Sequence, residues 1–318
     1  MPITILGIDI AKSKFDCCLL LNSKFKHKVF KNNQEGFINL SSWLSKEGVS
    51  LVHACLEATG NYGHELAEFL YNVGHKVSMV NPAQIKGFAQ SALSRTKTDK
   101  VDAKLIARFC QALQPGSWTP LAPETKQLQA LVRRVDALQN MLNQENNRLS
   151  VASSVTVKFI QKHITYLEND IKQTKKLIRD HINSHPNLKT KSDLLESIPG
   201  IGKATIAVLL GEIRCTEDFS SARKLAAFMG LVPRQFISGS SVRGKSRLCK
   251  TGNANLRKAL YMPAIVAKQY NPVIEAFCER LKLAGKPPMV IIGAVMRKLV
   301  HIIFGVLKSG KPFNPKVA

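Results

Sequence analysis

Acidic side chains are scarce in this sequence. Its 318 residues include 22 Asp and Glu against 46 Lys and Arg, which gives a formal net charge of +24 and a sequence pI near 9.9. Between positions 219 and 274 there is no acidic residue, whereas ten basic ones occur. Solvated surfaces usually mix both signs, so this imbalance predicts a polyanionic partner, with nucleic acid first and an anionic membrane surface second.

Paired cysteines and membrane segments are also missing. Seven cysteines occur without a C-x-x-C spacing, which argues against disulfides and a zinc site and for reduced thiols in the cytoplasm. No signal segment opens the chain, and no 18-residue apolar run is free of charge. The nearest case, Val290 to Leu307, contains Arg297, Lys298 and His301 and predicts a buried or groove-facing helix. We therefore expect a cytoplasmic protein without a membrane partner.

The first part of the chain has the pattern of an α/β domain. Its length allows two domains. Short apolar runs predict strands, and amphipathic stretches between them predict helices. The expected strands are Ile3–Ile8, Phe15–Leu21, a third around Val29-Phe30, Leu51–Leu56 and Lys76–Val80, and the expected helices are Phe37–Leu44 and His64–Val73.

Four carboxylates fall at the ends of these elements. Asp9 follows the first strand and Glu57 follows the strand Leu51–Leu56. If Thr98 or Asp99 opens a helix, Asp99 and Asp102 lie one turn apart on one face. Four such groups suit a two-cation site for phosphoryl transfer, although helix caps and solvent-facing strand ends remain the alternative.

Long helices follow a break at Gln114–Pro123, which holds three prolines. Apolar residues then recur at steps of three and four, which predicts a helical hairpin or coiled coil. These positions are Leu128, Leu131, Val135, Leu138, Leu142 and Leu149, then Ile160, Ile164, Leu167, Ile171, Thr174 and Ile178. An intramolecular pair and a contact between protomers stay equally open.

A helix-hairpin-helix-like motif follows the boundary at His185-Pro186. The segment Leu194–Ala207 predicts a helix, a tight glycine turn and a second helix. Gly200 and Gly202 can free backbone N–H groups for a phosphate, and Lys203 adds charge. A plain turn between helices is the alternative.

The acid-free segment holds a serine-rich stretch, Ser238–Arg247, which predicts a flexible loop. Arg234, Arg243, Lys245 and Arg247 supply groups that can clamp a phosphate. No His or Asp lies beside Ser238 to act as a base, so the residues alone favour a loop serine over a nucleophile.

Together these residues resemble one family. Gly7–Lys12, Glu57–Gly60, Asn81-Pro82 and Lys97–Ala103 are similar to the acidic motifs of the DEDD transposases of bacterial insertion sequences, and the resemblance spans nearly the whole chain. The second half matches through Ile198–Gly202, Phe228–Pro233 and Ser238–Ser241.

The resemblance implies three domains. Residues 1–123 would form an α/β RNase H-like (RuvC-like) domain, and residues 124–186 a helical coiled-coil segment. Residues 187–318 would form a mainly α C-terminal transposase domain with the helix-hairpin-helix-like motif.

The resemblance also implies an activity. Family members recombine donor and target DNA under the guidance of a structured bridge RNA. Asp9, Glu57, Asp99 and Asp102 would bind two Mg²⁺ ions, for which Mn²⁺ can substitute, and Ser238 would form a phosphoserine link to the cut strand. Lys12 would contact nucleic acid, as would the residues of the glycine turn and the basic segment. The working unit would be a homo-oligomer, a dimer or tetramer, acting at the bacterial nucleoid.

Three other functions compete with this one. An RNase H-like nuclease or junction resolvase would use metal-activated water and leave Ser238 as a loop residue. A non-catalytic nucleic-acid-binding module would need the carboxylates only as caps and strand ends. An actin-like ATPase would use Gly7-Ile8-Asp9 as a phosphate loop, but the chain lacks an evident second glycine-rich nucleotide loop.

Overall fold

The computed structural model describes residues 4–58, 60, 62–93, 98–213, 219–239 and 242–316. It divides the chain into two compact units, Met1–Pro120 and Leu121–Ala318. The predicted break at 114–123 thus contains the boundary between the units.

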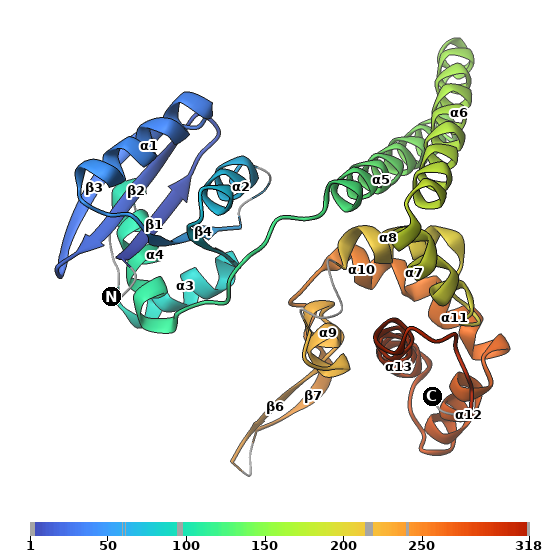
Figure 1. Ribbon diagram of the computed structural model, residues 1–318. Helices are drawn as coiled ribbons and strands as arrows, with labels where there is room; N and C mark the ends of the chain where they lie inside the picture. The colour runs from blue at the N-terminus through green and yellow to red at the C-terminus, as the bar shows by residue number, and fades with distance from the viewer. Residues whose placement is uncertain are drawn as a thin grey trace. The chain divides into compact units, whose positions relative to one another are not determined.

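Five strands of the first unit form one sheet in the order β3-β2-β1-β4-β5 (Figure 1). Strands β1, β2 and β3 form an antiparallel meander, while β4 and β5 run parallel to β1. The bounds are Thr4–Ile10, Lys14–Leu21, Lys24–Lys31, Val52–Glu57 and Lys76–Val80. The predicted strands are confirmed. β3 extends well beyond the predicted Val29-Phe30. Most of its residues are exposed or half-buried, so no apolar run in the sequence marks its full length.

Helices cover both faces of this sheet (Figure 1). Leu6 and Ile8 of β1 pack with the buried residues of α1 (Gln34–Lys46) and α2 (His64–Asn72). Side chains alternate along a strand, so Gly7 and Asp9 point to the other face. There α3 (Pro82–Ser91) and α4 (Asp99–Leu113) complete the domain.

Helix α4 lies directly on strand β1 at Gly7. A Cβ atom on Gly7 would come within 2.3 Å of the Ala103 carbonyl oxygen and 2.3 Å of the Ala107 nitrogen. Ala103 and Ala107 are one helical turn apart, so small residues on both elements let the two backbones approach. This contact fixes the first turn of α4 beside the end of β1.

We predict that Gly7→Ala forces α4 off the sheet and lowers the free energy of unfolding by about 3 kcal/mol, because backbone atoms cannot yield as side chains do. Gly87→Ala is the matched control, since a Cβ at Gly87 meets no atom within 4 Å. Urea unfolding of both variants tests this, and a wild-type midpoint for Gly7→Ala would contradict it.

The second unit begins with the predicted helical hairpin. Helices α5 (Pro123–Leu149) and α6 (Ser154–Ser184) pack against each other through Leu138, Leu142, Leu167 and Ile171. Figure 1 shows the hairpin projecting from the remaining helices of this unit. The predicted helical hairpin is therefore confirmed, and its two helices pair within one chain.

The remaining helices surround α13. This helix packs against α7, α9, α11 and α12, and its apolar face supplies much of the core of the unit. By length and composition it could cross a membrane, but 56% of its apolar window is buried inside the protein, as predicted for a core helix. The bounds are α7 Pro186–Glu196, α8 Lys203–Glu212, α9 Ala222–Phe228, α10 Ala254–Ala259, α11 Tyr261–Tyr270, α12 Pro272–Leu283 and α13 Pro288–Ser309.

The prediction of a flexible loop at 238–247 is wrong for most of this segment. Its residues belong largely to a two-stranded hairpin, β6 (Pro233–Ser238) and β7 (Val242–Leu248). Strands are predicted from apolar alternation, and β7 carries Arg, Lys, Ser and Gly instead. Gly239, at φ +56°, begins the turn after β6.

Candidate functional site

Three carboxylates lie in a row across the sheet, on the face covered by α4. Asp9 pairs with Asp16 of β2 in the antiparallel ladder, and Gly7 pairs with Cys55 in the parallel one. Because side chains alternate, Glu57 shares the face of Asp9 and Asp16.

Two further carboxylates stand on the first turn of α4, where the helix begins as predicted. Thr98 is its N-cap, and the Thr98 hydroxyl accepts a hydrogen bond from the Val101 N–H at 3.3 Å. The reading of Asp99 as the N-cap is therefore wrong, since Thr98 fills that role. Asp99 and Asp102 are left to face the end of β1, where the packing of α4 on Gly7 holds them.

The charges of this cluster act on Asp9. Burial, and after it the negative charges of Asp102, Asp99, Glu57 and Asp16, together raise the pKa of the Asp9 carboxyl from 3.8 to about 6. Glu57, Asp99 and Asp102 are thus near enough to act on Asp9. Such mutual repulsion favours a bound cation, which would relieve it.

A lysine and a histidine of the meander complete the site. Lys14 Nζ donates to Asp99 Oδ2 at 2.7 Å and to Asp16 Oδ2 at 3.3 Å. Asp16, whose side chain is only 6% exposed, also lies 2.8 Å from His27 Nε2. The hydrogen bond from Lys14 holds the pKa of the Asp99 carboxyl below its usual value.

Sequence reasoning missed Lys14, Asp16 and His27. Asp16 lies inside the apolar run Phe15–Leu21, where it attracts no notice by itself. Its position follows only from the register that pairs it with Asp9. The sequence did contain a signal for Asp16. A short turn between two antiparallel strands pairs the end of the first with the start of the second, which places Asp16 opposite Asp9.

The donor types suit Mg²⁺, which prefers carboxylate oxygens. Within the described ranges, however, no three His, Cys, Asp or Glu side chains lie close enough to hold a metal ion. One oxygen of Asp99 is engaged by Lys14. The carboxylates therefore have to draw together, and Lys14 has to release Asp99, before all four can share an ion. Lys12, which is exposed, lies in the neighbouring turn.

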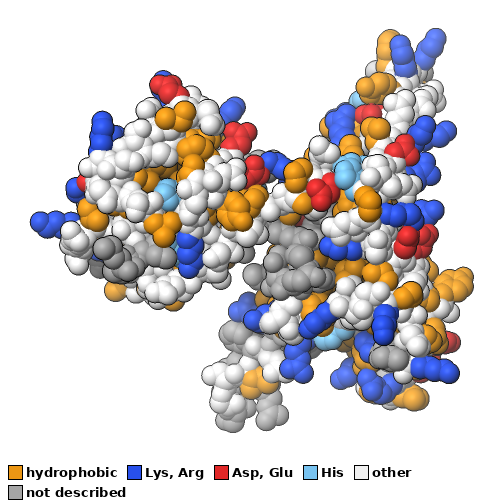
Figure 2. All heavy atoms as spheres, viewed as in Figure 1, with side chains coloured by type: hydrophobic (Ala, Val, Ile, Leu, Met, Phe, Trp, Pro, Cys, Tyr) orange, Lys and Arg blue, Asp and Glu red, His pale blue; other side chains and the backbone are white. Residues whose placement is uncertain are grey.

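Ser238 lies in the second unit at the end of β6 and is exposed. Arg234 and Arg247 are paired across the hairpin and are both exposed, so their guanidinium groups are accessible to a phosphate. The side chains of Arg243 and Lys245 lie outside the described residues. On the visible face of this unit, Lys and Arg side chains outnumber acidic ones (Figure 2).

The predicted glycine turn joins α7 to α8. Gly200 has φ +99°, and a Cβ there would come within 2.9 Å of Ala267, so this glycine serves the packing of the turn on α11. Gly202 is the N-cap of α8, provides no side chain and has open space around it. Lys203 opens the helix. The N-terminus of α8 is thus accessible to an anion.

Comparison with known proteins identifies both halves of the chain. Residues 6–152 match the family model of the DEDD transposases of the IS110 group. Residues 192–279 match the model described as the transposase IS116/IS110/IS902 family.

Similar proteins cover the full length. The pilin gene-inverting protein of Moraxella lacunata is 37% identical over 321 residues, which span 100% of this chain and 99% of that protein. The transposase for insertion sequence element IS1328 of Yersinia enterocolitica is 26% identical over 99% of this chain and 100% of its own length. Among solved structures, T. thermophilus RuvC in complex with a Holliday junction substrate covers 36% of this chain and 98% of its own, with 13% identity and a TM-score of 0.27, too distant a likeness to support an inference.

The match over residues 6–152 defines a transposase of the DEDD class. By both domain matches and its full-length relatives, this chain belongs to the IS110/IS116 family of transposases, as its sequence motifs predicted.

We predict that Asp9→Asn stabilises the metal-free protein at pH 7. The pKa of Asp9 is raised from 3.8 to about 6 in the folded chain, so its ionisation costs stability as the pH rises through this interval. Asn removes that cost, which is on the order of 1 kcal/mol after allowance for solvent screening.

Thermal melts in EDTA between pH 4 and pH 8 measure the effect. The variant should lose less stability than wild type as the pH rises from 4 to 6. Glu65→Gln, which changes an exposed carboxylate on α2, is the control and should match wild type. A lower melting temperature for Asp9→Asn at pH 7 would contradict the assignment.

Proposed function

We propose that this transposase is an RNA-guided, Mg²⁺-dependent recombinase that cuts and rejoins DNA through a phosphoserine link at Ser238. The observation that carries the proposal is the placement of four carboxylates from three elements at one end of the sheet: Asp9 lies at the end of β1, Glu57 ends β4, and Asp99 and Asp102 stand on the first turn of α4, which packs on β1 at Gly7. Carboxylates placed so near one another repel, which costs free energy unless a cation is bound, and helix caps or strand-end residues without a shared role would not be expected to gather in this way. The match to the DEDD transposases supports the same roles.

We assign the three domains as the sequence predicted them. Residues 1–123 are proposed as an RNase H-like domain, 124–186 as the coiled coil and 187–318 as the transposase domain. The support is the meander followed by two parallel strands, with carboxylates at adjacent strand ends.

Asp9, Glu57, Asp99 and Asp102 would hold the Mg²⁺ ions, or Mn²⁺ in their place. When bound, these ions would favour the deprotonated serine hydroxyl and stabilise the leaving oxygen. The Ser238 oxygen attacks a DNA phosphate, so a serine–phosphorus bond forms while the strand's phosphorus–oxygen bond breaks. The freed strand end takes up the proton. The link conserves the phosphodiester energy, and rejoining needs no ATP.

The basic side chains would hold the nucleic acids. Arg234, Arg243, Lys245 and Arg247 are proposed to clamp DNA beside Ser238, and Lys12 to contact it beside the carboxylates. Gly202 and Lys203 at the start of α8 are proposed to bind a phosphate, with Gly200 shaping the turn. A bridge RNA would select the DNA, and a homodimer or tetramer would combine one protomer's carboxylates with another's serine.

We predict that Ser238→Ala abolishes the covalent protein–DNA adduct. Wild type incubated with cognate DNA, guide RNA and Mg²⁺ should give an adduct that survives SDS, and the variant should give none, because no oxygen remains to form the link. Ser246→Ala, an exposed serine on β7, is the control. Strand cleavage by Ser238→Ala at the wild-type rate would show a hydrolytic nuclease instead.

A further prediction concerns Lys14. Lys14→Met should lower the Mn²⁺ concentration at half-saturation about two- to fivefold, because the ammonium group competes for Asp99 through an exposed ion pair. Lys24→Met, at the far end of β3, should leave it unchanged. Isothermal titration calorimetry without nucleic acid measures this. Weaker Mn²⁺ binding by Lys14→Met would show that Lys14 helps to assemble the site.

A further inference from the structure

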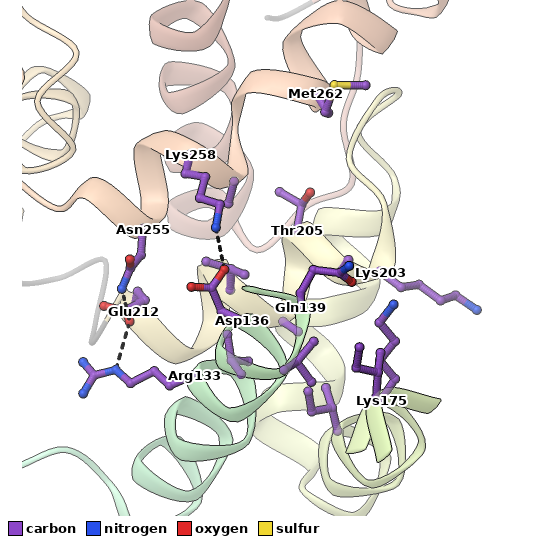
Figure 3. Close-up of a pocket in the computed structure, with 18 of the residues that line it drawn as sticks. Arg133, Asp136, Gln139, Lys175, Lys203, Thr205, Glu212, Asn255, Lys258 and Met262 are labelled. Atoms are coloured by element: carbon purple, nitrogen blue, oxygen red, sulfur yellow. Dashed lines mark hydrogen bonds and ion pairs between the residues drawn. The ribbon is translucent and has the colours of Figure 1, made fainter. Parts of the chain in front are cut away.

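A groove of about 910 Å³ lies within the second unit, between the α5–α6 hairpin and the helices α8, α10 and α11 (Figure 3). Val135, Ile171, Val208 and Met262 supply apolar surface to it. Six Lys and Arg side chains line it against three Asp and Glu. We call it the α6–α8 groove.

The charges of the groove are distributed unevenly. On one side they are matched: Lys258 lies 2.6 Å from Asp136, and Arg133 lies 3.5 Å from Glu212. On the α6 side, Lys172, Lys175 and Arg179 follow one another at helical spacing, so they share a face, on which Glu168 is the one acidic residue among those described that lines the groove. Across the described parts of the chain, no carboxylate forms an ion pair with these three. Figure 3 shows Lys175 and Lys203 apart from both ion pairs; Lys203 lies 4.0 Å from Glu196, in an exposed ion pair that a phosphate can displace.

The N-terminus of α8 opens into the same groove. Lys203, Ala204 and Thr205 form its first turn and line the groove, and their N–H groups receive no side-chain cap because Gly202 is the N-cap. Thr205 is only 9% exposed. No hydrogen bond of its hydroxyl is found among the described residues, so the hydroxyl is available to a ligand in the groove. Uncapped N–H groups, the Thr205 hydroxyl and the ammonium groups of Lys172 and Lys175 thus surround one space.

We infer that the α6–α8 groove binds an unpaired stretch of nucleic acid. A phosphate would accept hydrogen bonds from the first turn of α8 and the Thr205 hydroxyl, with Lys175 and Lys203 nearby. This inference rests on the proposed function, which makes nucleic acid the substrate class, and it adds a site beyond the acidic cluster and Ser238.

The apolar surface of the groove favours a single strand over a duplex as the bound form of nucleic acid. A duplex presents mainly phosphates and sugars to a protein, and its stacked bases would leave Val208 and Met262 uncovered. An unpaired nucleotide can lay a base against aliphatic side chains while its phosphate meets the charged wall. RNA and DNA share this chemistry, so they have to be separated by experiment.

Binding is measured by fluorescence anisotropy with labelled 12-nucleotide RNA, DNA of the same sequence and a 12-base-pair duplex. The Ser238→Ala chain is the background, so no reaction is needed and failure of the serine mechanism leaves the result readable. Lys172→Gln with Lys175→Gln is the test variant. Lys158→Gln with Lys162→Gln removes the same charge from the distal part of α6, away from the groove.

The test pair should weaken single-strand binding at least tenfold and reduce the slope of log affinity against log salt by about 1.4, as expected for two lost phosphate contacts. The control pair should change both by less than half as much, and duplex binding should change less than twofold in either. Thr205→Val should weaken single-strand binding about threefold without changing the salt slope, because a hydroxyl contact releases no counterion.

Tighter binding of the RNA would identify the guide as the occupant, and tighter binding of the DNA would identify the cut strand. Equal losses in the test and control pairs would overturn the site, since only the general positive field would then act. Equal losses for duplex and single strand, or equally effective competition by polyglutamate, would overturn the choice of an unpaired strand.

Discussion

The contact between Gly7 of β1 and the backbone of α4 is the constraint on which the acidic site depends. With no side chain between them, strand and helix approach closely enough for Ala103 and Ala107 to lie on the sheet. The first turn of α4 then stands over the end of β1. Asp99 and Asp102 are thereby brought to Asp9 and Glu57, which the parallel pairing of β1 and β4 has already placed side by side. Carboxylates that are far apart in the sequence are thus placed at one end of the sheet, because no side chain separates the two backbones.

This arrangement carries an electrostatic cost, and the protein offsets part of it internally. Burial raises the pKa of the Asp9 carboxyl, and the repulsion of its neighbours adds to this effect. Lys14 partly neutralises the cluster by bonding Asp99 and Asp16, and His27 supports Asp16 from β3. Because the ion pair of Lys14 with Asp99 is exposed on both sides, it is weak and can yield to a stronger cation. The carboxylates are thus held near one another, but not close enough to share a cation while Lys14 is bonded to Asp99.

Most of this could be predicted from the sequence, for definite physical reasons. Strands such as Leu51–Leu56 and the heptads of α5 and α6 carry apolar periodicities that fix the buried face. The four carboxylates were found because charged residues at the ends of apolar runs are conspicuous. The role of Asp16 was not predicted, because it depends on which residue of β1 pairs with it, and strand register is a long-range property. The strand β7 was not predicted either, because its polar sequence shows no apolar alternation. The α6–α8 groove likewise exists only once helices from three parts of the chain pack together.

The central claim is that the carboxylates of β1, β4 and α4 gather around a divalent cation. A crystal structure of the chain with Mn²⁺, read at the manganese anomalous edge, tests it most directly. The account predicts a peak within about 2.2 Å of oxygens from Asp9 and Asp102, with Lys14 displaced from Asp99. A cation bound elsewhere, or an empty cluster with Lys14 still on Asp99, would contradict it.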